Sequence, residues 1–473
     1  MSADTTMSLS ARMAKFAHEL RLDAIPAPVL HLARLHLIDA IGVGLAASRV
    51  PAHRKLLTQL RAEGSGSAAA DREDSGPSTV FGFSGGVAPQ LAAMLNGTSV
   101  HSLEYDDTHM ASIVHGSAVI VPAVLAAAEA NALQLDDVLR LVVVGWETLV
   151  RLGEASPGGF QRRGFQVTSV GGVIVAAMLA SVARGASVAQ TTAAMGIAGS
   201  QAGGIFEFLS NGSNVKALHP GWAAHAGLWA AGLAQAGMTG PETVLEGRFG
   251  LFNTYAADEQ AGARLAAALR DLGDNWKLED AAFKFYPCCH YIHPYLECTQ
   301  ALLAQVTAGG GVEAIASVHC RVAPGAATVI CEPWSAKQNP QSANEAKYSL
   351  PYCIARVLLG RPVDVPAMTA RDIDAESVAL SSRIQWTPRP DSRFPECFDA
   401  DVEIVLTNGT RLHHAVPQVL GSPQRPAGEA AIKEKFVRNA STALAASGSE
   451  RLWQSVMQAG GTMRELQQSL RAT

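Results

Sequence analysis

Residues 29–47, VLHLARLHLIDAIGVGLAA, form a long apolar segment that decides how the first part of the chain folds. A second segment of this kind, DDVLRLVVVGWETLVRLGEA, occupies residues 136–155. Helices that are apolar nearly all round are buried within a larger helical domain. Because such segments recur up to about residue 270, separated by Gly, Pro and Ser breaks, the pattern predicts a large all-helical domain over residues 1–270.

The pattern changes between residues 271 and 417. All seven cysteines lie here, the segment ASVHCRV at 316–322 alternates with period two, and VEIVLTNGTRLHHAV at 402–416 has Asn-Gly between two alternating runs. An Asn-Gly pair in that setting indicates a β-hairpin. We therefore expect a smaller α+β domain over 271–417. Helical periodicity resumes afterwards, so residues 418–473 are predicted to return to the helical domain, giving a mainly α fold.

Composition narrows the class of partner. The chain has 473 residues, 48% of them hydrophobic, and a net charge of -5 without a block of Lys and Arg, so neither a nucleic acid nor an anionic membrane is an expected partner. The apolar run at 171–183 is shorter than the roughly 20 residues that span a bilayer and is predicted to be a buried helix. The first 20 residues do not resemble a secretory signal, and unpaired cysteines favour reduced thiols, so a cytoplasmic protein with a small-molecule ligand is expected.

One short segment concentrates titratable groups. Residues 100–116, VHSLEYDDTHMASIVHG, contain three acids and three histidines and are predicted to lie where two helices meet at a loop. In one interpretation the acids only cap helices and face water. In a second, His109, His115 and Asp107 bind a metal, although their spacing matches no known zinc motif. In a third, the side chains converge on a cleft.

Two further segments favour a binding cleft. NGSNVKALHPGWAAHAG at 211–227 has Lys216 and His219 just before an apolar helix, where an ammonium group can meet an anionic ligand. FKFYPCCHYIHPYLEC at 283–298 combines a lysine, two thiols and two histidines. A Cys/His nucleophilic pair is conceivable there, but adjacent buried thiols are more often inert packing groups.

Taken together, these segments resemble the MmgE/PrpD family. The resemblance rests on six motifs that occur in the order and approximate spacing of that family and extend over nearly the whole chain. They are EYDDTHMASIVHG, GFQVTS (164–169), KALHPGWAAHAG, EGRFGLF (246–252), KFYPCCHYIHPYLE and EAKYSLPYCIA (345–355).

The resemblance implies a fold and a class of reaction. It implies a helical domain built from the N-terminal part and the C-terminal tail, a smaller α+β lid, a homodimer, and an active site between the domains without a metal or an organic cofactor. Members of the family include 2-methylcitrate dehydratases, cis-aconitate decarboxylases and an iminodisuccinate epimerase. The expected partner is therefore a small polycarboxylate.

The same resemblance, with the chemistry of the side chains, predicts the site residues. His115 is the expected proton carrier because imidazole titrates near neutral pH. The two lysines and the threonine would stabilise charge that develops on a carboxylate, the glutamate would orient His115 or hold a lysine, and a lid tyrosine would donate a proton. The catalytic set is Glu104, Thr108, His115, Lys216, Lys284 and Tyr352, and the expected substrate-binding set is Asp107, Gln166, His219, Cys289 and His293.

Two positions depart from the family pattern. Gln166 occupies the position of a histidine in many relatives, and it cannot exchange a proton near neutral pH. Cys289 occupies the position of another histidine in the decarboxylases. Both departures weaken a decarboxylase assignment most. The leading hypothesis is a cofactor-independent hydro-lyase of the 2-methylcitrate dehydratase type, with an epimerase, a decarboxylase or a catalytically silent polycarboxylate-binding protein as alternatives.

Overall fold

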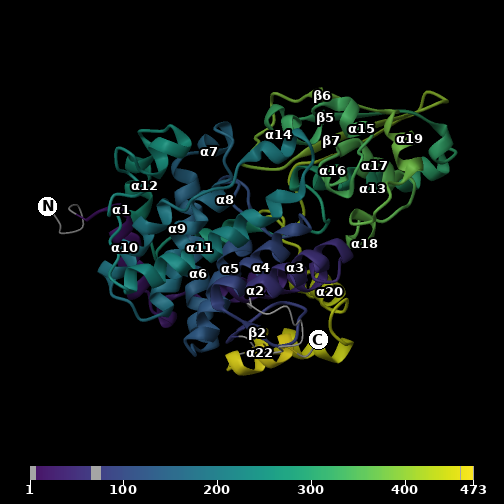
Figure 1. Cartoon of the computed structure of the whole chain (residues 1–473). Helices are drawn as coiled ribbons and strands as arrows, with labels where there is room; N and C mark the ends of the chain where they lie inside the picture. The colour runs from purple at the N-terminus through teal and green to yellow at the C-terminus, as the bar shows by residue number, and fades with distance from the viewer. Residues whose placement is uncertain (1–6, 65–75, 459, 472–473) are drawn as a thin grey trace.

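The computed structural model describes residues 7–64, 76–458 and 460–471, and it confirms the predicted mainly α fold with a small sheet in the C-terminal half. Figure 1 shows the helical domain with the smaller domain, which contains the sheet, beside it. The main helices of the large domain are α1 (Leu9–Glu19), α2 (Ala27–Ala47), α3 (Pro51–Gly64), α4 (Pro89–Ser102), α5 (Gly116–Ala130), α6 (Leu135–Ala155), α9 (Gly172–Ala183), α10 (Val188–Gly199), α11 (Leu218–Gln235) and α12 (Ala261–Ala268).

The predicted buried helices at 29–47, 136–155 and 171–183 are confirmed as α2, α6 and α9. Among the described residues, α2 is a helix long and apolar enough to cross a membrane, but 78% of its most apolar window is buried inside the protein. It packs against α4, α5, α6 and the C-terminal helix α20 (Glu429–Ala440). Its apolar composition is therefore accounted for by its position in the core of the helical domain.

The small domain is built around a four-stranded sheet of order β6-β5-β7-β8. β5 (Ile315–Val322) pairs in parallel with β6 (Ile384–Pro388) and antiparallel with β7 (Ala400–Leu406), which forms a hairpin with β8 (Arg411–Val416). The predicted hairpin is confirmed: Gly409 adopts φ 86°, a value that glycine tolerates without strain. The helices of the small domain are α13 (His293–Ala308), α14 (Pro324–Ile330), α15 (Trp334–Gln338), α16 (Ala343–Ala346), α17 (Leu350–Leu358), α18 (Val365–Met368) and α19 (Ala375–Ser381).

The C-terminal helices α20 and α21 (Ala446–Met457) pack against α2, and α22 (Met463–Arg471) packs against α21 and lies beside β2 (Gly86–Val87) in Figure 1. The larger hydrophobic core draws its residues from 9–283 and from 432–470, whereas the second core draws them from 288–416 and Phe208. The tail thus shares a core with the first half of the chain. The predicted domain limits at 270 and 417 stay predictions.

An ion pair inside the fold joins α20 to α2. The Lys435 ammonium donates to the Asp39 carboxylate at 2.9 Å and to the carbonyl oxygen of Tyr105, also at 2.9 Å. All three groups are buried, and burial raises the pKa of Asp39 and lowers that of Lys435. Because a buried charge is tolerated only with a partner, this contact holds the segment after α4 against the C-terminal helix.

Helices α4 and α11 approach each other backbone to backbone at two glycines. A Cβ atom on Gly97 would lie 2.7 Å from the Cα of Gly221, and one on Gly221 would lie 2.3 Å from the carbonyl oxygen of Met94. Only glycine permits this approach. This approach brings the end of α4 close to the start of α11. Glu104 lies just after the end of α4, and Lys216 lies just before the start of α11.

A short ladder joins the loop after α4 to the segment that enters the small domain. β3 (Thr108–His109) pairs antiparallel with β4 (Ala281–Ala282), with Thr108 opposite Ala282. Lys284 follows two residues after that partner. The ladder therefore sets Thr108 and Lys284, which are 176 residues apart in the sequence, at neighbouring positions.

The Gly221→Ala variant tests the close approach of α4 and α11. Its added methyl group meets backbone atoms that cannot move aside, so we expect the free energy of unfolding to fall by about 1–3 kcal/mol in urea denaturation. Gly232→Ala on the same helix is the matched control, because its Cβ meets nothing closer than 3.7 Å. The control should gain about 0.5–1 kcal/mol from helix propensity. Equal stability of the two variants would contradict the proposed packing.

Candidate active site

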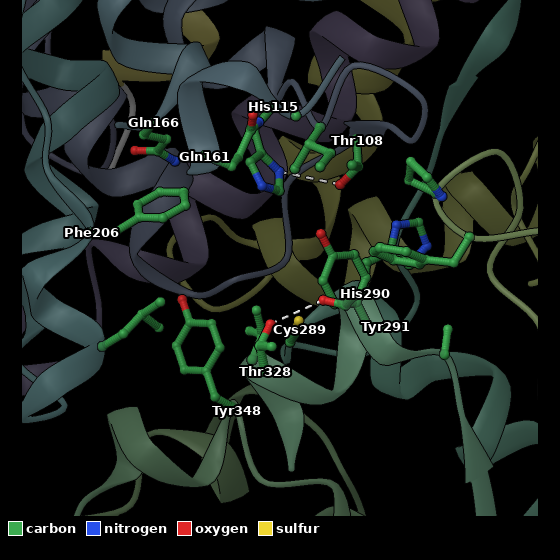
Figure 2. A pocket seen from close by; sticks show the side chains of 18 of the residues that line it. Thr108, His115, Gln161, Gln166, Phe206, Cys289, His290, Tyr291, Thr328 and Tyr348 are labelled. Carbon is green, nitrogen blue, oxygen red and sulfur yellow. Dashed lines mark hydrogen bonds between the residues drawn. The ribbon is translucent and has the colours of Figure 1, made fainter. Parts of the chain in front are cut away.

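A cavity of about 810 Å³ lies between the helical domain and the small domain. Figure 2 shows Thr108, His115, Gln166 and Phe206 on one side of it and Cys289, His290, Tyr291 and Tyr348 on the other. The predicted site residues that line the cavity are Glu104, Thr108, His115, Gln166, Lys216, Lys284 and Cys289. These seven residues come from four separate motifs of the sequence, and Tyr348, from a fifth motif, lines the cavity as well.

Glu104 is the centre of charge in the cavity. The Lys216 ammonium donates to both of its carboxylate oxygens, at 2.7 and 2.8 Å, and the Lys284 ammonium donates to its carbonyl oxygen at 3.1 Å. Burial alone would raise the pKa of the Glu104 carboxyl, but the two ammonium groups lower it well below its usual range. Two cations thus face one carboxylate, which leaves an excess of positive charge for an anionic ligand.

The backbone at Glu104 is unusual as well. Its φ of 54° lies in the left-handed region, which costs a residue with a side chain roughly 1–2 kcal/mol. Such conformations persist where surrounding contacts demand them, and they gather at functional sites. Here the conformation turns the chain after α4 so that the carboxylate meets Lys216 and the carbonyl oxygen meets Lys284.

His115 presents an unprotonated nitrogen to the cavity. It lies at the N-terminus of α5, and its Nδ1 is 3.0 Å from the carbonyl oxygen of Asp107 and 3.2 Å from the Thr108 hydroxyl. A carbonyl oxygen can only accept, so Nδ1 carries the hydrogen and Nε2 has a free lone pair. Burial lowers the pKa of His115 to about 3, and the neighbouring lysines act in the same direction. His115 is therefore neutral at physiological pH, and the expectation that it titrates near neutral pH is wrong for the ligand-free site because burial disfavours the charged ring.

Gln166 connects two histidines beside His115. Its amide nitrogen donates to Nε2 of His101 at 3.0 Å, and its amide oxygen accepts from Nδ1 of His219 at 2.7 Å. His101 in turn donates from Nδ1 to Asp106 at 2.7 Å. Burial would raise the pKa of the Asp106 carboxyl, but His101 and His115 lower it below its usual range. The ring of His101 meets that of His115 edge-on at 5.0 Å and so supports one side of the base.

Three residues of the predicted substrate-binding set do not line the cavity. Asp107 is buried behind it, where its carboxylate accepts from His36 at 2.7 Å and from the backbone of Ser117 at 3.1 Å. His219 lies in the first turn of α11 and lines a separate pocket beside Gln166. His293 is buried in α13, with Nε2 donating to the carbonyl oxygen of Cys288 at 3.3 Å. These residues support the site from behind.

The predicted proton donor Tyr352 also lies outside the cavity. It is on α17, inside the small domain, and its hydroxyl accepts from Arg356 and from the backbone of Asp374, each at 3.3 Å. Tyr348, in the turn before α17, lines the cavity instead and accepts from Lys216 at 3.1 Å. The two tyrosines are one helical turn apart in the sequence. Ser349, a helix-capping residue between them, is the signal that could have separated them, because α17 begins after it.

Sequence reasoning also left His290 without a role. Its ring lines the cavity although it is only 2% exposed. Cys289, directly before it, lines the cavity too, and burial raises the pKa of its thiol to about 11. The thiol is thus neutral at physiological pH and poorly suited to nucleophilic attack, which removes the support for a Cys/His nucleophilic pair.

Part of the cavity wall is apolar. Phe206 and Phe208 come from the helical-domain sequence, and Val329, Phe394 and Pro395 come from the small domain. The charged groups around Glu104 therefore share one cavity with an apolar surface. This arrangement suits a ligand that combines several carboxylates with a hydrocarbon substituent.

Among the described residues, His101, Asp106 and His115 offer ligand atoms within 4.8 Å of one another, as a metal site would require. The predicted alternative set of His109, His115 and Asp107 does not form such a group. Nδ1 of His101 and a carboxylate oxygen of Asp106 already bond to each other, and Gln166 occupies the remaining nitrogen of His101. These atoms are engaged as a hydrogen-bond network.

The curated proteins that are similar to this chain are named as cis-aconitate decarboxylases or as similar to one. A cis-aconitate decarboxylase-like protein, oryM, of Aspergillus oryzae is 28% identical over 78% of this chain and 77% of its own length. The cis-aconitate decarboxylase of Aspergillus terreus is 27% identical over 89% of this chain and 87% of its own. The mouse cis-aconitate decarboxylase is 26% identical over 92% of this chain and 88% of its own length.

The domain profiles agree with these similarities and with the predicted resemblance. The profile of the MmgE/PrpD N-terminal domain matches residues 11–263, and that of the MmgE/PrpD C-terminal domain matches residues 286–459. Together they account for the helical domain, the small domain and the first two C-terminal helices. The chain belongs to the MmgE/PrpD family.

Proposed function

We propose that this protein is a cofactor-independent lyase that acts on a small polycarboxylate by proton transfer at a carbon next to a carboxylate. The observation that supports this most is the neutral His115, whose free Nε2 faces a cavity with two lysines beside one glutamate. Bound carboxylates raise the pKa of this neutral ring and so make it a stronger base toward a proton on carbon, and the ammonium groups stabilise the charge that then spreads onto the adjacent carboxylate.

The remaining groups fit loss of water from a hydroxy acid. The Thr108 hydroxyl can donate to the developing oxyanion because the proton on Nδ1 of His115 is directed to Asp107. Tyr348 accepts from Lys216 and keeps its own hydrogen, so it can protonate the departing hydroxide from the small-domain side. This is the role that the sequence analysis assigned to Tyr352.

The leading substrate class is a 2-methylcitrate-type hydroxy acid. Its carboxylates match the excess positive charge around Glu104, and its alkyl substituent matches the apolar wall at Phe208 and Val329. Burial of each additional methylene group in such a wall contributes about 0.8 kcal/mol. The predicted homodimer and cytoplasmic location stay predictions, and light scattering of the purified protein measures the first.

Decarboxylation of a cis-aconitate-type acid is the second candidate. The names of the curated relatives favour it, since they are cis-aconitate decarboxylases or similar to one. Gln166 and Cys289 weigh against it, because neither side chain exchanges a proton readily near neutral pH. Epimerisation, as on iminodisuccinate, would use the same base and lysines, and a silent binding protein would use the lysines alone.

Proton NMR in D2O with 2-methylcitrate, citrate, cis-aconitate and iminodisuccinate separates these reactions. We expect 2-methylcitrate to lose water and give a new methyl signal beside a double bond. His115→Gln should lower kcat by about 100- to 10,000-fold, the usual contribution of a positioned base. His31→Gln, on an exposed side chain outside the cavity, is the control and should keep the wild-type rate.

Other outcomes lead to other assignments. Itaconate formation from cis-aconitate would indicate the decarboxylase, and deuterium incorporation with a change of configuration would indicate an epimerase. If His115→Gln turned over 2-methylcitrate at the wild-type rate, proton transfer by His115 would be wrong, whichever product formed.

The pH dependence of the wild type tests the protonation state of His115. With its pKa lowered to about 3, His115 is in its basic form at every pH above about 4, and protonation removes activity only as the pH falls through that value. We therefore expect kcat/KM, corrected for the measured ionisation of the substrate, to be flat from pH 5 to 8. Bound carboxylates raise the pKa of the ring, so kcat should decline at higher pH than kcat/KM does. An acid limb near pH 6.5 in the corrected kcat/KM would contradict this assignment.

Phenylalanine variants of the two tyrosines test the reassigned proton donor. Tyr348→Phe removes the hydroxyl in the cavity and should lower kcat by about 100-fold or more. Tyr352→Phe removes a hydroxyl inside the small domain and should leave kcat and KM within about twofold of wild type, with a loss of stability of about 1 kcal/mol. Steady-state kinetics with thermal melts measures both effects, and the reverse order of the two variants would restore Tyr352 as the donor.

A further inference from the structure

His290 is a buried imidazole whose two ring nitrogens have no hydrogen-bond partner among the described residues. It is the first residue of the short 3-10 turn His290–Ile292 and lines the cavity. Figure 2 shows it on the small-domain side, with Cys289 and Tyr291. None of the roles assigned above uses this ring.

An unpartnered imidazole is costly in such a position. A buried polar atom without a partner costs roughly 1–3 kcal/mol, and most buried polar groups in folded proteins are satisfied for that reason. The aromatic ring of Phe398 meets the imidazole edge-on at 5.1 Å, and the ring of His293 does so at 4.8 Å. These rings pack around His290 without bonding to it, and the imidazole borders the cavity with both nitrogens covered, so a ligand reaches a nitrogen through a rotation of the side chain.

The electrostatic surroundings of His290 favour an anion. In addition to burial, two ammonium groups, Lys284 and Lys435, lower its pKa, whereas the nearby rings of His115 and His293 are themselves neutral because burial lowers their pKa. Its chain neighbours Cys289 and Tyr291 are neutral, since burial raises the pKa of both. A carboxylate is therefore the group that this ring is best placed to bind, and binding would favour protonation of the ring.

We propose that His290 binds a carboxylate of the substrate. This inference rests on the proposed action on a polycarboxylate. Positions 289 and 290 both line the cavity, so an imidazole at either position would border the ligand. The thiol of Cys289 cannot replace it, because a neutral thiol is only a weak hydrogen-bond donor.

Calorimetric binding of propane-1,2,3-tricarboxylate tests the proposal without turnover, since this probe has no hydroxyl group to lose. Titrations at pH 7 in two buffers of different ionisation enthalpy give the affinity and the number of protons taken up. We expect His290→Gln to weaken Kd by about tenfold and to take up fewer protons than wild type, because glutamine can donate a hydrogen bond but cannot be protonated. A merely structural role would not change proton uptake.

Two further variants complete the test. His225→Gln on α11 is the control, because that ring is partly buried and does not line the cavity, and it should keep the wild-type proton uptake. The double variant Cys289→His/His290→Gln restores an imidazole at the neighbouring position and should recover most of the lost affinity. It also serves as the second variant if His290→Gln does not fold.

The outcomes distinguish this inference from the proposed function. Wild-type affinity and proton uptake in His290→Gln would overturn the role of His290 and leave the lyase assignment standing. Binding of the probe by wild type without turnover of any acid in the NMR panel would contradict the lyase and leave the role of His290 standing. Failure of wild type to bind the probe at millimolar concentration would contradict both.

Discussion

The paired hydrogen bonds from Lys216 to both oxygens of Glu104 are the contact on which the rest of the site depends. The carboxylate belongs to the loop after α4, and the ammonium belongs to the turn before α11. Tyr348 of the small domain bonds to the same ammonium, and Lys284 bonds to the carbonyl oxygen of Glu104. One ion pair thus joins two helices of the large domain to two segments of the small one, and the cavity lies where they meet.

The geometry of this ion pair depends on the position of the backbone segments that carry Glu104 and Lys216. The close approach of α4 and α11 at Gly97 and Gly221 sets the distance between its two sides, and the buried pair of Lys435 and Asp39 fixes the carbonyl of Tyr105 next to Glu104. Helix α20, which carries Lys435, therefore contributes to the site without lining the cavity. A charge held this rigidly is pre-organised for a ligand, which is where electrostatic stabilisation is most effective.

Much of the fold was predictable because its signals are local. Apolar helices at 29–47 and 136–155 and the Asn-Gly turn of the β7–β8 hairpin depend on a few neighbouring residues each. The charged centre of the site was predictable from the family motifs that carry Glu104, Lys216 and Lys284. The fit of α4 against α11 was not, because a contact between two glycines leaves no periodic signal. The direction of a side chain was the other limit: Tyr348 and Tyr352 are one turn apart, and only the start of α17 decides which of them meets the cavity.

Gln166 determines how protons can reach the site. An amide nitrogen only donates and an amide oxygen only accepts, so the chain of bonds from His219 through Gln166 to His101 and Asp106 has one direction. That direction places the hydrogen of His101 on Nδ1 and leaves no titratable link between the two histidines. A histidine at position 166 could pass a proton along this path, whereas glutamine cannot do so near neutral pH. We therefore expect a proton that His115 removes to return to the substrate or to leave through the cavity rather than through Gln166. This constraint favours reactions in which one base and one donor on opposite sides of the cavity are sufficient.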